Sequence, residues 1–207
     1  MNAKGNLRRL MRSDLPADTV EMARYLIGKV IVHDTAHGRL SGRIVETEAY
    51  PVGDEAGHAM RGRTPGNGSL FAERGHAYVY LIYGISFLLN ISSEREGVGA
   101  GVLLRAIEPL DGVERMRSAG IRIHRDHVGS GPGRLAKAMK VDLRHNGVDL
   151  CSEFSSLWLA VTPRKRRAIS KTVRIGLTRG AESLLRFYER GNKYVSGPRR
   201  LLGDSAK

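Results

Sequence analysis

The chain has 207 residues, of which 41% are hydrophobic and 27% charged, a composition typical of one globular domain. Its 34 Lys and Arg against 21 Asp and Glu give a formal net charge of +13, which indicates a polyanionic partner. Nucleic acid is favoured over a membrane, because the sequence shows neither a long apolar run nor a long basic amphipathic helix. A single cysteine, Cys151, excludes an internal disulfide and fits a reducing compartment.

The N-terminal segment is strongly basic, and we expect residues 1–13 to form an arm ahead of one domain over residues 14–204. Asp18, with Glu21 three residues later, predicts the start of a helix. Gly28 is a typical end for that helix, because apolar residues recur at helical spacing up to this point.

Two pairs of β-like segments follow. The first pair, 29–34 and 39–50, is joined by a turn at His37–Gly38, and the second, 77–81 and 87–92, by a turn over 82–85. Between them, residues 51–69 form a long loop of the kind that usually carries function.

The rest of the chain predicts shorter elements. They are a buried strand over 101–106, a helix opened by Asp111 and Glu114 and ending near Gly120, a helix over 134–140, and strands over 157–162 and 173–177. The predicted fold class is therefore α+β, a single domain with an antiparallel sheet of hairpins as its core and peripheral helices.

Two acids and an aromatic residue share one face of the strand over 39–50. Side chains alternate along a strand, so Glu46, Glu48 and Tyr50 point away from the face that carries Val45, Thr47 and Ala49. A carboxylate beside a ring could act as a general base next to a stacked planar substrate. Taken alone, this segment is more simply explained as an exposed strand face with solvated acids.

Aromatic residues also mark the second hairpin. Tyr78 and Tyr80 share a face, whereas Tyr83 falls in the turn beside Gly84. In a basic protein, an aromatic residue at a hairpin tip could stack on bases or wedge between base pairs. The alternative, ordinary aromatic packing in a sheet, is strong for Tyr78 and weaker for Tyr83.

Three further features each allow two interpretations. Arg105, near the end of an apolar strand, needs a carboxylate or an anionic ligand, or forms a structural salt bridge, for instance to Glu108. The glycine-rich segment 129–133 could bind a phosphate or be a plain turn. The pairs His33/His37 and His124/His127 have metal-like spacing, but no acidic or cysteine cluster completes a site, so surface histidines are favoured.

Eight segments, in this order along most of the chain, are similar to the alkyladenine (3-methyladenine) DNA glycosylase family. They are Gly42–Tyr50, Asp54–His58, Arg63–Pro65, Tyr78–Gly84, Asn90–Ser93, Val102–Pro109, Ser130–Pro132 and Arg174–Gly176.

The resemblance implies a role for each matching residue. Glu48 would activate the attacking water, and Arg105 would hold that water and the sugar-phosphate region. Tyr83 would fill the gap left in the duplex by the extruded base, with Tyr78 in support.

The resemblance also implies a base pocket. Its residues would be Tyr50, His58 and Tyr80, which sandwich the base, Asn90, which disfavours guanine, and Leu177, where some members have Val. Weaker matches imply contacts with the DNA backbone by Arg63, Thr64, Ser130 and Gly131. The loop from Tyr50 to His58 is one residue shorter than in mammalian relatives, which leaves the lesion preference open.

As a member of this family, the protein would be a monofunctional hydrolase of base excision repair that needs no metal or cofactor. Its partner would be duplex DNA containing 3-methyladenine, 7-methylguanine, hypoxanthine or ethenoadenine. We expect a monomer in the bacterial cytoplasm, associated with the nucleoid. No lysine replaces Glu48, so we expect hydrolysis without a covalent intermediate.

Three other functions compete with this one. A non-catalytic nucleic-acid-binding protein would explain the charge but not Glu48, since a carboxylate repels phosphate. A sugar O-glycosidase would need two carboxylates facing each other across a bond, not neighbours on one strand. A helix-hairpin-helix glycosylase would be mostly helical, which disagrees with the predicted β structure.

Overall fold

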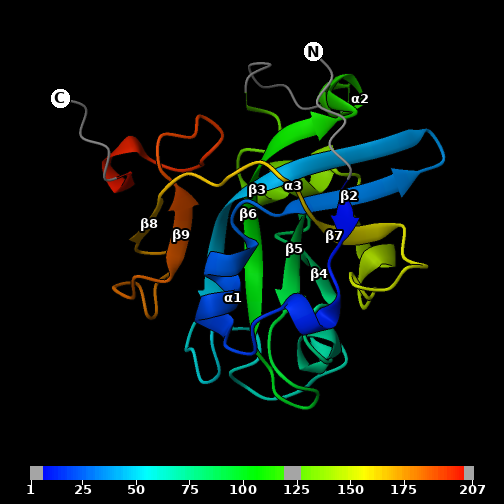
Figure 1. Ribbon diagram of the computed structural model, residues 1–207. Coiled ribbons are helices and arrows are strands. Elements are labelled where there is room, and N and C mark those ends of the chain that lie inside the picture. Colours follow the sequence, from blue (N-terminus) through cyan, green and yellow to red (C-terminus); the bar gives the residue numbers. More distant parts are fainter. Residues whose placement is uncertain (1–6, 119–126, 203–207) are drawn as a thin grey trace.

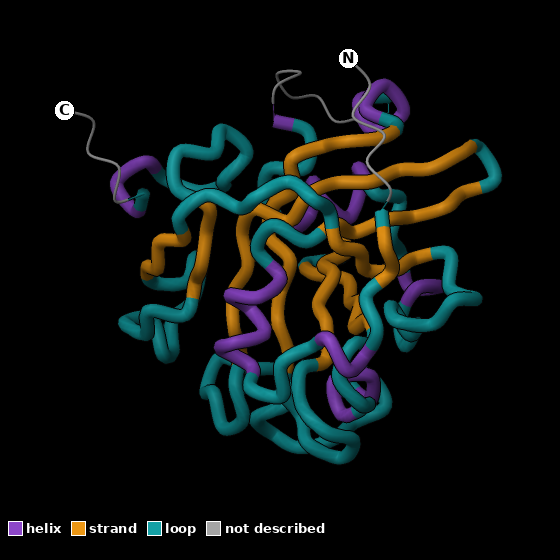
Figure 2. Tube along the Cα trace, in the orientation of Figure 1, coloured by secondary structure: helices purple, strands orange, loops and turns teal. Residues whose placement is uncertain are grey.

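The computed structural model describes residues 7–118 and 127–202, in which nine strands form one antiparallel sheet flanked by helices (Figures 1 and 2). This confirms the predicted α+β class. The strands are β1 (Arg8–Arg9), β2 (Val30–Thr35), β3 (Gly38–Tyr50), β4 (Ala77–Ile82), β5 (Ser86–Ser92), β6 (Gly101–Asp111), β7 (Leu157–Val161), β8 (Ile169–Thr172) and β9 (Arg186–Glu189). The α-helices are α1 (Thr19–Leu26), α2 (Val113–Arg117) and α3 (Pro132–Ala138), and none of the described helices has the length and apolar character to cross a membrane.

The longest strand, β3, organises the sheet. Its first half pairs with β2, residues 46–48 pair with β9, and the opposite edge pairs with β6 along most of its length. The strand order is β1-β7-β2-β3-β6-β5-β4, with β8 attached to β9. The register between β3 and β6 shifts on both sides of Glu46, which leaves Arg105 without a direct partner across the ladder. Such a bulge bends a strand and redirects a side chain, which here is that of Arg105.

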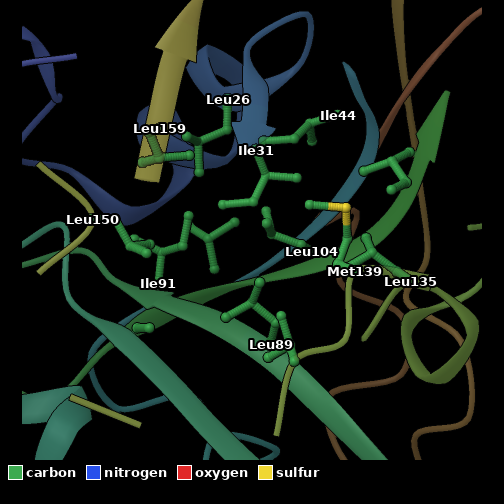
Figure 3. Close-up of a cluster of buried hydrophobic side chains, with 14 of the residues drawn as sticks. Leu26, Ile31, Ile44, Leu89, Ile91, Leu104, Leu135, Met139, Leu150 and Leu159 are labelled. Carbon is green, nitrogen blue, oxygen red and sulfur yellow. The ribbon is translucent and has the colours of Figure 1, made fainter. Parts of the chain in front are cut away.

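One face of this curved sheet carries the hydrophobic core. Figure 3 shows Leu26 of α1, Ile31 of β2, Leu104 of β6 and Leu135 of α3 meeting in a single cluster. Each such side chain contributes about 1.5–3 kcal/mol when it is removed from water. Because side chains alternate, the neighbours of these residues along β3 to β6 point to the opposite face, where the cavity lies.

Helix α1 begins as predicted. The Asp18 side chain accepts a hydrogen bond from the Glu21 amide at 2.8 Å, and Met22, Ala23 and Leu26 turn into the core. Gly28 follows the helix with a positive φ of 87°, and its amide donates to Ile44 O at 2.8 Å, which ties the helix end to β3.

The second hairpin is also confirmed. Tyr83 and Gly84 both have positive φ, 52° and 67°, and the Ile85 amide donates to Ile82 O at 3.0 Å. These features define a tight turn whose twist matches that of the strands. Tyr83 adopts the left-handed backbone conformation there, which residues other than glycine usually avoid.

Several predicted boundaries were wrong. The strand predicted over 101–106 runs on to Asp111, so this residue does not cap a helix; Gly112 precedes α2 instead, and the predicted end at Gly120 lies outside the described residues. Helix α3 begins at Pro132, two residues before the predicted start.

The predicted strand over 173–177 is also absent, since β8 ends at Thr172 and β9 begins at Arg186. The described part of the expected N-terminal arm includes β1, which pairs with β7, and the fully buried Leu10.

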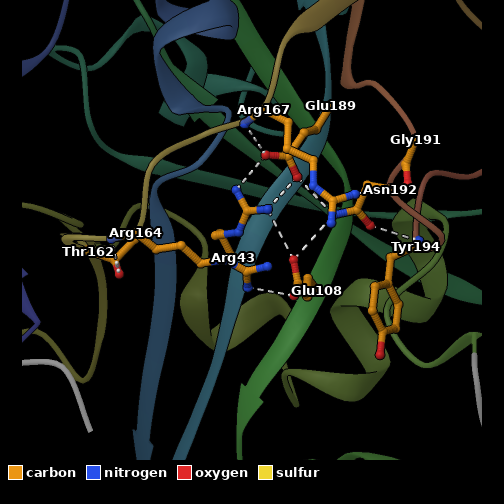
Figure 4. A network of polar contacts seen from close by, with 9 residues as sticks. All are labelled: Arg43, Glu108, Thr162, Arg164, Arg167, Glu189, Gly191, Asn192 and Tyr194. Atoms are coloured by element: carbon orange, nitrogen blue, oxygen red, sulfur yellow. Dashed lines mark hydrogen bonds and ion pairs between the residues drawn. The ribbon is translucent and has the colours of Figure 1, made fainter. Parts of the chain in front are cut away.

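A buried polar network joins β3, β6 and β9 (Figure 4). Arg43 donates to Glu189 at 2.8 Å and to Glu108 at 3.1 Å, and Arg164 donates to Glu108 at 2.7 Å. Glu108 therefore pairs with these two arginines, and the proposed salt bridge between Arg105 and Glu108 was wrong.

Candidate active site

A cavity of about 420 Å³ lies on the face of the sheet opposite the core. A row of paired residues runs across its floor: Glu48 on β3 is paired with Leu103 on β6, which is paired with Asn90 on β5, which is paired with Tyr78 on β4. The sheet thus places residues of β3, which comes early in the chain, beside residues of the three later strands β4, β5 and β6. Of the predicted site residues, Glu48, Tyr50, His58, Tyr78, Tyr80, Tyr83, Asn90, Arg105 and Leu177 all line this cavity.

Glu48 is held from three directions at the cavity wall. Its Oε1 accepts from the Ile175 amide at 2.8 Å and lies 3.1 Å from Nη1 of Arg105, and its Oε2 accepts from the Tyr50 hydroxyl at 3.0 Å. All three partners donate to or attract the carboxylate, so they fix its orientation.

The two glutamates of this strand have different surroundings. Both are fully buried, so the interpretation of a solvated strand face was wrong. Glu46 accepts from Arg105 Nε at 2.9 Å, from Arg186 Nε at 2.7 Å and from the Ser196 amide at 2.6 Å, and it does not line the cavity. Glu46 therefore holds segments of the fold together, and Glu48 is the carboxylate that borders the cavity.

Arg105 bridges these two carboxylates. Burial lowers the pKa of this guanidinium, but Glu48 and Glu46 outweigh burial and the net pKa is raised. The side chain also lines the cavity, so it can contact a ligand as well as Glu48. A purely structural salt bridge therefore does not account for the position of Arg105 at the cavity.

Aromatic rings form the cavity wall next to Glu48. The rings of His58 and Tyr80 lie 4.4 Å apart, those of Tyr78 and Tyr80 stack at 5.3 Å, and His58 Nδ1 is 2.8 Å from the Tyr78 hydroxyl. Burial lowers the pKa of His58, which favours its neutral form. Burial raises the pKa of Tyr78 and of Tyr80 to about 12 and raises that of Tyr50, so the phenols stay protonated.

The hairpin tip projects at the rim of the cavity. Tyr83 is 88% exposed and Ile85 83% exposed, and Tyr83 also borders the cavity. Large apolar side chains exposed to this degree have no packing role in the chain itself, so they are free to contact a partner.

Residues 13–193 of the chain match the family model of the methylpurine-DNA glycosylases. The chain belongs to this family. A relative from Mesorhizobium japonicum is 58% identical over 93% of this chain and 92% of its own length. Relatives from Paraburkholderia phytofirmans and Methanocella arvoryzae are 53% and 41% identical, over 93% and 90% of this chain and 90% and 94% of their own lengths. Each of the three is named as a candidate 3-methyladenine DNA glycosylase.

The chain is therefore a DNA glycosylase, a hydrolase whose substrate is DNA. The residues with weaker matches lie outside the cavity lining. Arg63 and Thr64 are exposed in the long loop, whereas Ser130 is buried and its amide donates to His127 O at 3.1 Å. Gly131 precedes α3 with a φ of 105°. The Ser130 amide therefore already donates a hydrogen bond within the chain. A phosphate site formed by the other backbone groups of residues 129–133 stays a prediction.

Of the histidines in the two pairs, His37 and His127 are exposed, as predicted, whereas His33 is not. His33 is buried, not at the surface, and its Nδ1 lies 2.7 Å from Met139 O while its Nε2 lies 3.2 Å from His145 Nε2. His124 lies outside the described residues. In the part of the chain that the structure describes, no group of three or more His, Cys, Asp or Glu side chains could hold a metal ion.

Several groups that shape the glycosylase site could not be found from sequence patterns. The Ile175 amide lies in the segment predicted as a strand, and Ser196 lies in a segment without a recognised pattern; both reach the two glutamates only through the fold. The motif Arg174–Gly176 was noted as a family match, but its connection to Glu48 could not be read from spacing.

Proposed function

We propose that the chain removes alkylated or deaminated purines from duplex DNA, by hydrolysis with a water activated by Glu48. The observation that carries this proposal is the place of Glu48. Its carboxylate, held by Arg105 and two neutral donors, borders a cavity whose walls carry aromatic side chains.

For a cationic methylated purine the chemistry requires a general base and no acid, whereas a neutral base such as hypoxanthine departs as an anion and takes up a proton from solvent. A methylated purine such as 3-methyladenine is cationic, so it leaves readily once water attacks C1′ of the sugar. Glu48 accepts a proton from that water, and Arg105 keeps the carboxylate aligned and adds positive charge beside the sugar-phosphate. The water oxygen bonds to C1′, the bond from C1′ to the base breaks, and the base departs with the bonding electrons.

Recognition requires the base to leave the stack. Extrusion costs a few kcal/mol, less for a damaged base, and an apolar wedge can fill the gap. Tyr83, at the exposed hairpin tip, is suited to this role. Tyr50, His58 and Tyr80 offer electron-rich faces that hold a planar or cationic base by stacking and cation–π attraction.

Lesion selection depends on the remaining cavity residues. Asn90 stands on the floor, where its Nδ2 donates to Tyr78 O at 3.3 Å, and we propose that it excludes the exocyclic amine of guanine. Leu177, in the segment that also carries Ile175, lines the same cavity. The names of the relatives point to 3-methyladenine, and hypoxanthine, 7-methylguanine and ethenoadenine are the further candidates. We propose that the enzyme acts as a monomer.

The test is base release by wild type and Glu48→Gln from duplexes with one hypoxanthine or one ethenoadenine, and from methylated DNA, scored as alkali-labile sites. We expect wild type to release base and Glu48→Gln to bind lesion DNA without releasing it. Tight DNA binding without release by either protein would favour a non-catalytic binder. A borohydride-trapped enzyme–DNA adduct would refute direct hydrolysis.

A further inference from the structure

Arg174 lies behind the cavity wall and has no role in the proposed chemistry. Its side chain is only 1% exposed, and it is not part of the cavity lining. Its guanidinium makes a two-point contact with Asp54, from Nη1 to Oδ2 at 2.6 Å and from Nη2 to Oδ1 at 3.1 Å. A forked pair of this kind fixes the relative orientation of the two side chains as well as their distance.

The same guanidinium also binds backbone atoms in two other segments. Nη1 donates to Ala49 O at 3.0 Å, at the end of β3, and Nη2 donates to Gly180 O at 3.3 Å. With Asp54 in the loop after β3, one side chain thus joins three segments: the end of β3, the loop that follows it and the segment at Gly180.

Each of these segments carries a group of the proposed site. The Arg174 guanidinium lies 4.7 Å from the centre of the Tyr50 ring, which lines the cavity. The next residue, Ile175, donates its amide to Glu48. Asp54 accepts from the Ala56 amide at 2.8 Å and so shapes the loop that leads to His58.

We propose that Arg174, paired with Asp54, is a positioning residue that sets the Tyr50 ring, the His58 loop and the Ile175 amide relative to Glu48. The inference rests on the proposed function. A lysine at this position would keep the charge but would lose the fork and the planar contact with the ring, so it could not hold all three segments at once.

Arg43 provides a matched control. It is also 1% exposed and makes a forked contact with a buried carboxylate, Glu189, with Glu108 as a further partner (Figure 4). Its network does not line the cavity. Arg43→Lys therefore removes a buried fork of the same kind without touching the proposed site.

The experiment compares the single-turnover rate of base release from a hypoxanthine duplex for wild type, Arg174→Lys, Asp54→Asn and Arg43→Lys, each at a temperature where circular dichroism shows it folded. A displacement of about 1 Å can slow a positioned reaction by roughly 100-fold, so we expect a fall of roughly 10- to 100-fold for Arg174→Lys and Asp54→Asn. Arg43→Lys should stay within about threefold of wild type, because it lowers stability and leaves the site geometry intact. Asp54→Asn keeps the size of the side chain and its contact with the Ala56 amide. This variant therefore tests the same pair if Arg174→Lys does not fold.

A spectroscopic measurement separates positioning from stability. In a Glu48→Gln background, which prevents turnover, the emission of bound ethenoadenine reports how the base stacks on the aromatic wall. We expect Arg174→Lys to change this emission and Arg43→Lys to leave it unchanged.

Equal rates for Arg174→Lys, Asp54→Asn and wild type, or equal losses for Arg174→Lys and Arg43→Lys, would overturn the inference. If wild type releases no base from any lesion, the proposed function fails instead. An active wild type with an inactive Glu48→Gln and a fully active Arg174→Lys would refute only the positioning role.

Discussion

Substitution of Glu46 by glutamine tests the division of labour between the two buried glutamates. Among the described residues, Glu46 is the only carboxylate that contacts Arg186, whose side chain is fully buried. Glu46 also accepts a hydrogen bond from the Ser196 amide. Glu46→Gln leaves Arg186 with the Ser196 carbonyl, at 2.7 Å, and without a carboxylate. Glu48→Gln, in contrast, leaves both Arg105 and Arg186 paired with Glu46.

The magnitude follows from the cost of a buried, unpaired charge. Removing one partner of a buried ion pair typically costs about 3–5 kcal/mol. In a protein of this size each kcal/mol shifts the Tm by about 2–4 °C, so Glu46→Gln should lower the Tm by roughly 6–20 °C. Glu48→Gln should cost about 1 kcal/mol or less, since the amide keeps an oxygen acceptor for Ile175 and Arg105 reaches the cavity.

Urea and thermal unfolding of the two variants, followed by circular dichroism at neutral pH, measure these differences. A free energy of unfolding for Glu46→Gln within 1 kcal/mol of wild type would refute the structural assignment of Glu46. The reasoning would fail equally if Glu48→Gln were the more destabilised variant.

Two further predictions concern the hairpin tip and the buried histidine. Tyr83→Ser should leave the free energy of unfolding within about 0.5 kcal/mol of wild type, because the side chain is 88% exposed. It should nevertheless weaken binding to hypoxanthine duplexes relative to undamaged ones, measured by competition; equal loss for both would contradict a wedge. Burial lowers the pKa of His33 below its ordinary value, so the unfolded chain takes up the proton first. Stability should then fall as the pH drops below about 6.5, and His33→Asn should flatten this dependence in urea titrations at pH 7.5 and 5.5; an unchanged slope would remove His33 as its source.

Local signals were sufficient for much of the fold. The Asp18 cap placed α1, and the turn residues placed both hairpins, because cap and turn geometry depend on a few adjacent residues. The short strand β9 was missed because it has four residues, all of them buried, with no alternation to mark it. The segment 173–177 has an apolar pattern but forms the cavity wall, where tertiary contacts override strand propensity.

Burial of the acids could not be predicted from β3 alone. Alternation correctly assigned Glu46, Glu48 and Tyr50 to one face, but it could not show what covers that face. The cover consists of β9 and the irregular segments around Ile175 and Ser196, which lie more than 120 positions further along the chain. The identity of Glu48 as the residue facing the cavity came from the family resemblance, whereas its distinction from Glu46 came only from the contacts.

The charge balance of the site shows how the carboxylate proposed to be catalytic fits into a protein that must attract DNA. Glu46, Glu48, Arg105 and Arg186 form a buried group with two negative and two positive charges, joined by contacts of 2.7–3.1 Å. The +13 net charge of the whole chain is therefore left for the phosphates. Because Glu48 is paired locally with Arg105, at 3.1 Å, the charges that attract DNA are separate from the group that we propose to activate water.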